Sequence, residues 1–272
     1  MRYIDVPVNT IIGKRRFRAR PVRDVATDNG HVVPDFERLM QLVAKLGYRN
    51  ASFRLLFRGQ LADYPANRPD TEVSQLFPSL WRHGPRGREK ALKHLDKWTA
   101  KLRTLPILSR RDKRHLRTMP ERAWAVLQHY SSVTRCQTPL LDVTESVRVA
   151  ASFATYDYDQ DTPNPNPYGY LFVFGFPALQ QATTISVDDG LIMLRLQSVC
   201  PDKARRPHLQ RGFLVGTYPT NRFGGKAHKN FAHRLVAKLR LPTRSTFWNV
   251  DRPLDKIAVY PMTDEFRDAL AK

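Results

Sequence analysis

Arg58 is the residue whose type and position most favour binding of a small anionic ligand. The run 53–59 is short and apolar and ends in a glycine, which predicts a strand with Arg58 at its edge. A guanidinium pairs two oxygens of a phosphate at once, and Gly59 would let a ligand approach the backbone. Arg58 therefore suits a diphosphate. A structural salt bridge to Asp142 or Glu145 is the alternative.

Several motifs with well-defined chemistry are missing from the sequence. It contains no G-x-S-x-G, no phosphate loop ending in G-K-[ST], no H-E-x-x-H and no C-x-x-C. His228 and His233 are five residues apart, so they would not share a helix face, and no metal is expected. The acidic run that begins at Asp157 lacks the Gly and Glu that a calcium loop needs at its sixth and twelfth positions.

Charge is the strongest compositional feature. The 272 residues contain 45 Lys and Arg against 25 Asp and Glu, for a net charge of +20. Such a surplus favours nucleic acid, nucleotides or a nucleic-acid-associated protein as partner. Charged and uncharged residues alternate over 16–20, which predicts a basic strand, with a solvated edge strand as the alternative. The candidate nucleic-acid-binding residues in this region are Arg15, Arg16, Arg18 and Arg20.

The sequence predicts a protein of the cytoplasm. No apolar run reaches the roughly 20 residues of a membrane helix, and the first residues lack a signal-peptide pattern. Cys136 and Cys200 are too few for a disulfide framework and are expected to be ordinary thiols. A Cys136/His129 nucleophile pair would need more support than two residues seven apart.

Helices are expected mainly in the first half and strands in the second, which indicates an α+β fold in a single domain, 1–272. Its core is expected at about 53–215, after an N-terminal basic strand and helix (1–52) and before a C-terminal extension (216–272). Expected helices cover 34–46, 88–104, 109–117, 120–131, 146–156, 231–239 and 264–272. Expected strands cover 53–59, 168–176, 191–196 and 212–217, and an exposed loop is expected over 157–167.

Three segments together resemble the FRG domain family. Members typically carry F-R-G-Q, then P-x-L-x-R, then Q-H-Y…L-L-D-x-T-x-S…A-x-x-F-A, and a late R…Q-x-G-x-F. Here these motifs correspond to residues 57–60, 78–82, 128–154 and 206–213. The loop after Q-H-Y is longer than in the family, and Pro139 replaces the Arg that usually precedes L-L-D.

A second resemblance is to ADP-ribosyltransferases of the R-S-E type. It implies a small mixed β core split around a cleft that holds NAD as substrate. Arg58, with Gly59, matches the NAD-holding Arg, and Thr144 with Ser146 matches the frame that braces the pocket. Gln210 falls where the family has Glu and carries no charge.

Three more residues complete the candidate NAD site that this resemblance implies. Tyr130 could stack on nicotinamide, and His129 could bond a ribose hydroxyl or, alternatively, cap a helix end. Glu145 could supply the missing carboxylate, whereas Asp142 is interpreted as a structural acceptor. The catalytic candidates are thus Gln210, Glu145 and His129. The NAD-binding candidates are Arg58, Gly59, Tyr130, Thr144 and Ser146.

Three functions remain open at this point. The first is transfer of ADP-ribose from NAD to a macromolecule, possibly nucleic acid, as in toxins or phage-defence effectors. The second is NAD hydrolysis in the same pocket, with water as acceptor. The third is a non-catalytic basic module that binds nucleic acid or nucleotide.

Overall fold

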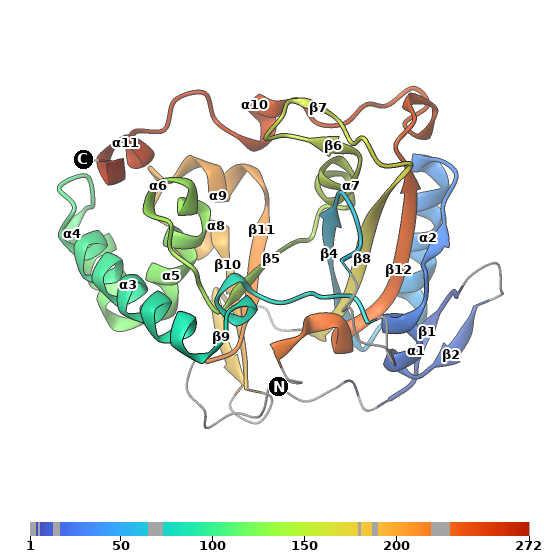
Figure 1. Cartoon of the computed structure of the whole chain (residues 1–272), viewed down its shortest axis with the longest axis horizontal. Helices are drawn as coiled ribbons and strands as arrows, with labels where there is room; N and C mark the ends of the chain where they lie inside the picture. The colour runs from blue at the N-terminus through green and yellow to red at the C-terminus, as the bar shows by residue number, and fades with distance from the viewer. Residues whose placement is uncertain are drawn as a thin grey trace.

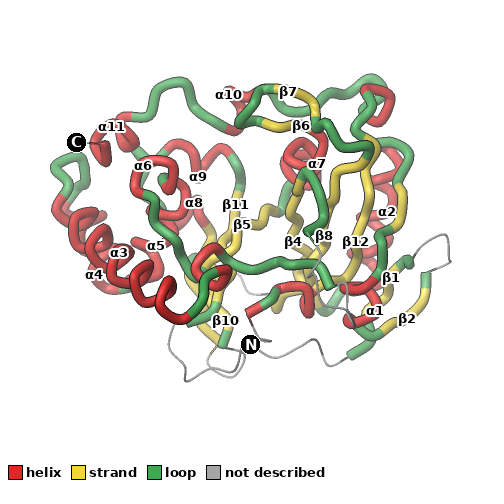
Figure 2. Tube along the Cα trace, in the orientation of Figure 1, coloured by secondary structure: helices red, strands yellow, loops and turns green. Residues whose placement is uncertain are grey.

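The computed structural model describes residue 4 and residues 6–12, 17–64, 73–178, 181–186, 190–218 and 229–271. These residues form a single α+β domain around a mixed eight-stranded sheet (Figures 1 and 2). The strands lie in the order β3-β12-β8-β4-β5-β11-β10-β9, and only the β3–β12 pair is parallel. Their bounds are β3 His31–Val32, β12 Leu235–Pro242, β8 Tyr168–Pro177, β4 Phe53–Gln60, β5 Leu140–Thr144, β11 Gly212–Gly216, β10 Leu191–Arg195 and β9 Thr183–Ser186.

The sheet is nearly divided in its middle. β4 pairs with β8 along its whole length, but with β5 only at Phe57 and Thr144. One hydrophobic core lies around β4, β8 and β12 and continues across one face of β5, β10 and β11, whereas a second core lies on the other face of β5, β10 and β11. Instead of two separate small sheets, the chain therefore forms one sheet that parts where β4 leaves β5.

Helices cover the two halves separately (Figure 1). α1 (Val22–Thr27) and α2 (Phe36–Arg49) lie at one end, beside the hairpin of β1 (Val8–Thr10) and β2 (Arg18–Arg20). At the other end lie α3 (Pro85–Thr104), α4 (Arg110–Thr118), α5 (Pro120–His129) and α6 (Ser131–Thr134). A 3-10 turn, η1 (Ser79–Arg82), leads into this helical end, and α7 (Val147–Thr155) packs on β4 and β8.

Local sequence signals account for the main helices. The Asp35 side chain accepts the Arg38 N–H and starts α2, which buries Leu39, Leu42 and Leu46. Ser109 and Asp112 form a reciprocal capping box at the start of α4. The expected helices over 34–46, 88–104, 109–117 and 120–131 are confirmed, the last as α5 followed by the short α6.

The remaining elements are short. They are α8 (Leu196–Val199), α9 (Arg205–Leu209), η3 (Phe231–Arg234), η4 (Ser245–Phe247), α10 (Lys256–Val259) and α11 (Glu265–Ala271). The segment from β12 to α11 crosses over one edge of the molecule and joins its two ends (Figure 2). Within the described ranges, no helix has the length and apolarity to span a membrane.

Two expectations are wrong. Residues 231–239 do not form one helix, because η3 gives way at Leu235 to β12. β12 lies next to the edge strand β3, and apolar and basic residues alternate over 237–241, which is the period of two that marks a strand. The acidic segment after α7 is not a plain loop either, because β6 (Tyr156–Asp157) pairs there with β7 (Thr162–Pro163).

Candidate functional site

A cavity of about 270 Å³ opens where β4 and β5 part. Its wall is formed by residues from β4, β5, α5, α7, α9 and the segment before α11. The polar and charged residues that line it are Arg58, Gln128, His129, Ser131, Asp142, Thr144, Arg206, Gln210 and Tyr260. The structure thus brings together four sequence candidates, namely Arg58, His129, Thr144 and Gln210, and Gly59 also lines the wall.

Arg58 is half-buried within β4, which continues through Gly59 to Gln60, so the strand does not end at the glycine as expected. Its Nη1 donates a 2.8 Å hydrogen bond to the backbone carbonyl of Asp142, so its visible partner is not a carboxylate. Its Nε is buried and has no hydrogen-bond partner within the described ranges. Burial lowers the pKa of Arg58, the Asp142 carboxylate opposes that shift, and Arg82 adds to it. The guanidinium is therefore oriented by backbone while one of its donors remains available.

Gly59 serves the packing of a helix. A Cβ built on Gly59 would lie 1.8 Å from the Ala150 carbonyl oxygen of α7, and one on Gly169 would lie 1.8 Å from that of Ala154. Only glycine allows α7 to sit this close to β4 and β8. Gly59 therefore has a packing role, and because it also lines the cavity, its role in ligand approach stays a prediction.

Asp142 is the carboxylate of the cavity. Its side chain is 41% exposed, and its Oδ2 accepts a 2.8 Å hydrogen bond from Gln128 Nε2. Thr138 in turn donates from its hydroxyl to Gln128 Oε1. This chain of hydrogen bonds fixes the direction in which the carboxylate points. The sequence interpretation of Asp142 as a structural acceptor missed its place on the cavity wall.

His129 is a neutral group beside Asp142. Its Nε2 lies 3.6 Å from Asp142 Oδ1, and only 4% of the side chain is exposed. Burial lowers the His129 pKa to about 4, with a further lowering by Arg206 that the Asp142 carboxylate opposes. The imidazole is thus uncharged near pH 7, and its buried Nε2 has no hydrogen-bond partner within the described ranges.

Arg206 and Tyr260 form a further part of the wall that no sequence candidate included. The Arg206 guanidinium lies 4.3 Å from the centre of the Tyr260 ring, and its Nη1 donates a 3.0 Å hydrogen bond to the His129 carbonyl. Its Nε is buried without a partner in the described structure. Burial raises the pKa of Tyr260. Arg206 opens the late R…Q-x-G-x-F motif, which was the available sequence signal, whereas nothing local marks Tyr260.

Thr144 and Gln210 hold the wall together. The Thr144 hydroxyl donates 3.0 Å to the Gln210 carbonyl and accepts the Ser146 N–H at 3.0 Å. Gln210 follows α9 in a turn rather than lying on a strand, and its amide donates to the Val259 carbonyl. Its side chain therefore ties the C-terminal segment to the site.

Three candidates lie away from the cavity wall. Tyr130 is 2% exposed, and its hydroxyl donates to Asp264 at 2.8 Å. Glu145 pairs with Arg54 at 2.9 Å, and the Ser146 hydroxyl caps α7 by accepting the Val149 N–H. None of the three is among the residues that line the cavity. The placement of Glu145 and Ser146 thus gives no support for direct contact with NAD, whereas Tyr130 lines an adjoining hollow of about 470 Å³.

The basic N-terminal candidates lie elsewhere. Arg15 and Arg16 fall outside the described residues. Arg18 is exposed and Arg20 is half-buried on β2, which lies beside α2 (Figure 1), and neither residue lines the cavity. Across the part of the chain that the structure describes, no three His, Cys, Asp or Glu residues group as metal ligands would.

The fold and the cavity define an α+β protein with a polar cleft set into a nearly divided sheet. Residues 54–162 match the family model of the FRG domain. The match includes Arg58, Gln128, His129 and Asp142, whereas Arg206, Gln210 and Tyr260 lie beyond it. No curated protein and no solved structure matched the chain.

Proposed function

We propose that the cavity binds NAD and that the protein transfers ADP-ribose from it to a macromolecule. The observation that carries this proposal is the convergence of two guanidiniums, Arg58 and Arg206, with a single carboxylate, Asp142, in one cavity. Guanidiniums with free donors suit a diphosphate. An oriented carboxylate suits the positive charge that develops on the ribose when nicotinamide leaves.

The space is compatible with this ligand. The cavity of about 270 Å³ has room for part of a dinucleotide, and an adjoining hollow of about 470 Å³ shares His129, Ser131, Arg206 and Tyr260 with it. Arg206 stands at this boundary, where the diphosphate of an extended NAD would cross from one space to the other. The remainder of that wall includes Arg267, a further cation.

In the proposed reaction the C–N bond between ribose and nicotinamide breaks, and the bonding electrons leave with nicotinamide. The acceptor's nucleophile then forms a bond to the same ribose carbon and loses its proton. Asp142 takes the role assigned from the sequence to Glu145 or Gln210. His129, neutral at pH 7, is placed to hydrogen-bond a ribose hydroxyl rather than to add positive charge.

A second candidate, NAD hydrolysis, is favoured by one specific observation. The Asp142 side chain is 41% exposed, so water can reach the carboxylate that would orient it. Both reactions would suit a toxin or a phage-defence effector, the role that the ADP-ribosyltransferase resemblance implies.

The test is incubation of the protein with NAD labelled in the adenosine part, with DNA, with RNA, and alone. Label in a polymer supports transfer, whereas release of nicotinamide without labelled polymer supports hydrolysis. Asp142→Asn should abolish either activity while the protein still melts cooperatively. Calorimetric titration with NAD that detects no binding at millimolar concentration would overturn the proposal.

A further inference from the structure

The helical end of the molecule concentrates the protein's positive charge. Residues 85–118, which span α3 and α4, contain 12 Lys and Arg against 3 Asp and Glu. Their net charge of +9 is nearly half of the +20 of the whole chain. Within the described structure, Lys93 is the one of these cations that forms an ion pair, with Glu89 at 2.9 Å. The positive charge of this end is therefore largely uncompensated.

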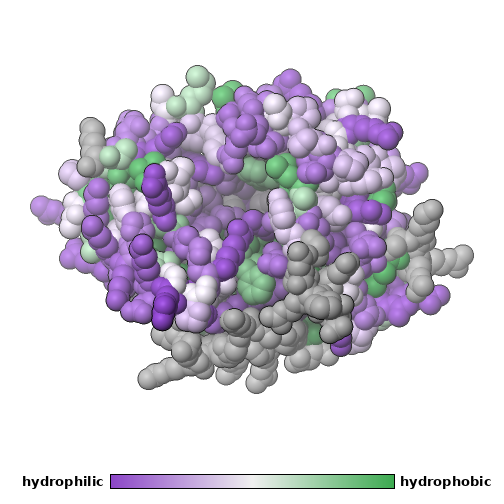
Figure 3. All heavy atoms as spheres, viewed as in Figure 1, coloured by the Kyte–Doolittle hydropathy of each residue, from purple (hydrophilic) through white to green (hydrophobic). Residues whose placement is uncertain are grey.

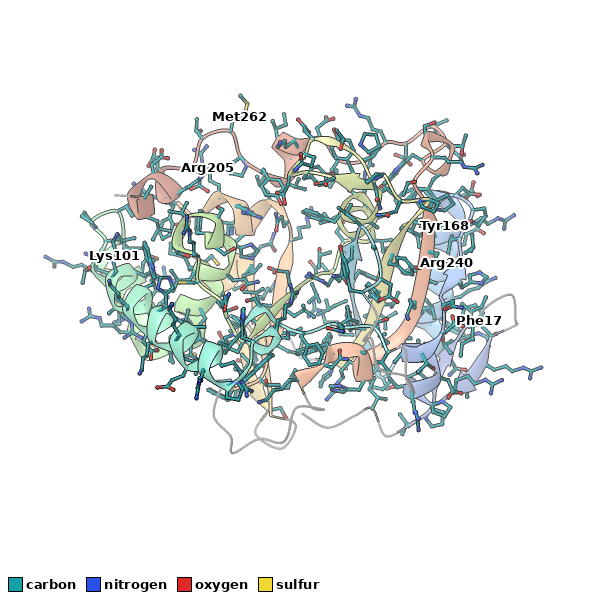
Figure 4. All side chains as sticks on the ribbon, viewed as in Figure 1. Phe17, Lys101, Tyr168, Arg205, Arg240 and Met262 are labelled. Carbon is teal, nitrogen blue, oxygen red and sulfur yellow. The ribbon has the colours of Figure 1, made fainter. Side chains whose placement is uncertain are left out.

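The cations of α3 form a single stripe. Five exposed residues follow one another at intervals of three or four, namely Arg86, Lys90, Lys93, Lys97 and Lys101. At 100° per residue they fall within an arc of about 80°, and at 1.5 Å per residue they span about 22 Å. Leu95, Thr99 and Leu102 are buried on the opposite side of the helix. Lys101 points away from the body of the molecule (Figure 4).

α4 repeats this arrangement on a smaller scale. Arg110, Arg114 and Arg117 are exposed at intervals of four and three residues, while Leu116 faces the core. Together with Arg111 and Thr118 they line a hollow on the surface. Both helices pack on α5, and long hydrophilic side chains project from this end of the molecule (Figure 3).

We propose that the exposed cations of α3 and α4 form a surface that binds the phosphate backbone of nucleic acid. A straight row of cations about 22 Å long matches a linear polyanion, which carries one phosphate per 3.4 Å along each strand of a duplex. Backbone contacts of this kind fix position without reading sequence, so DNA and RNA should bind with little sequence preference.

The stripe does not fit a lipid surface. A helix that binds a membrane inserts large apolar side chains opposite its charges. None of the large hydrophobic residues that are exposed in the described structure lies within 85–118. On α3 the side opposite the cations is covered by the protein's own core.

This surface is independent of the reaction proposed for the cavity. α5 separates it from the cavity, because α3 and α4 pack on α5 and its residues Gln128 and His129 reach the cavity wall. Binding is therefore measured without NAD, so failure of either proposal leaves the other standing. If both hold, nucleic acid would be held beside the cavity rather than in it.

The test is fluorescence anisotropy with the full chain, a labelled 30-base-pair DNA and a single-stranded RNA, over a series of salt concentrations. Two variants each remove three charges: Lys90→Gln/Lys97→Gln/Lys101→Gln on α3 and Arg110→Gln/Arg114→Gln/Arg117→Gln on α4. The matched control is Arg23→Gln/Lys45→Gln/Arg244→Gln, which removes three exposed charges from other faces. Arg18→Gln/Arg20→Gln tests the N-terminal hairpin.

Each helix variant should weaken duplex binding at least about tenfold near 0.1 M salt. It should also reduce the slope of log K against log salt by about 3, because each phosphate contact contributes about 0.9. The control should change affinity by less than about threefold, and all variants should melt like the wild type. Loss confined to Arg18→Gln/Arg20→Gln, or binding to phosphatidylserine vesicles without binding to either nucleic acid, would overturn the proposal.

Discussion

Arg58 Nη1 donates a 2.8 Å hydrogen bond to the backbone carbonyl of Asp142, 84 residues further along the chain. The bond spans the place where β4 and β5 part, close to their single pair at Phe57 and Thr144. It turns the guanidinium toward the cavity without neutralising it, and the Asp142 carboxylate remains oriented by Gln128. This bond therefore positions the guanidinium, while the bond from Gln128 positions the carboxylate, and the proposed chemistry depends on both charges.

Asp142→Asn should remove most of the NAD turnover while leaving binding nearly unchanged. Asparagine has the same shape and can still accept from Gln128, but it cannot stabilise positive charge on the ribose. Loss of one such electrostatic group typically lowers kcat about 100- to 1000-fold. Turnover is measured with labelled NAD and affinity by calorimetry. Unchanged kcat would remove Asp142 from the mechanism.

Arg58→Gln should weaken NAD binding without unfolding the protein. Loss of a charge-assisted contact with a buried partner costs about 2–5 kcal/mol, or roughly 30- to several-thousand-fold in Kd. The control Arg23→Gln removes an exposed arginine and should leave Kd within about twofold. A markedly lower melting temperature for Arg58→Gln alone would show that Arg58 is chiefly structural.

His129 should make the protein less stable in acid. Its folded-state pKa of about 4 lies below the ordinary value of 6.5, so between these pH values the unfolded state binds more protons. Its contribution is thus lost as pH falls from about 6.5 toward 4, and amounts to about 2 kcal/mol between pH 7 and pH 5. Urea unfolding at these two pH values, compared between wild type and His129→Gln, measures it. Equal pH dependence in both would contradict a buried neutral imidazole.

Gly59→Ala should severely destabilise the fold. The new methyl group would lie 1.8 Å from the Ala150 carbonyl oxygen, so α7 would have to move away from β4. Overpacking of this kind lowers the free energy of unfolding by about 1–3 kcal/mol. The clashing atom belongs to the backbone of α7, which cannot rotate away as a side chain could, so the cost should lie at the upper end of this range. Gly84→Ala is the control, because nothing lies within 4 Å of its added Cβ. Chemical denaturation that finds the two variants equally stable would refute the packing role.

Tyr130→Phe should lower stability but not NAD affinity. It removes the buried hydrogen bond to Asp264, whose other oxygen accepts the Phe266 and Arg267 N–H groups at the start of α11. Leaving a buried acceptor with fewer partners costs about 1–3 kcal/mol. Thermal melting and NAD titration on the same sample separate the two effects. A large loss of affinity at unchanged stability would show instead that the Tyr130 hydroxyl contacts NAD.

The sequence alone identified the α+β class, the main helices and the FRG motifs. These features are local, because caps such as Asp35 and Ser109 and the spacing of apolar residues act within one or two turns. The strand that contains Arg58 was equally clear from its apolar run, although it continues through Gly59 to Gln60. For β12, the alternation of apolar and basic residues over 237–241 itself indicates a strand, so the helix expected there was wrong on local grounds as well.

Only the tertiary structure decided which side chains share the cavity. The tertiary structure places Asp142 on the cavity wall and Glu145 away from it. Asp142 lies within β5, whereas Glu145 follows that strand and forms an ion pair with Arg54. The tertiary structure also brought in Arg206, bonded to the carbonyl of His129 across 77 residues, and Tyr260 beneath that guanidinium. Contacts at such separations arise from how the two halves of the sheet meet, and they impose no periodicity or spacing on the sequence near either residue.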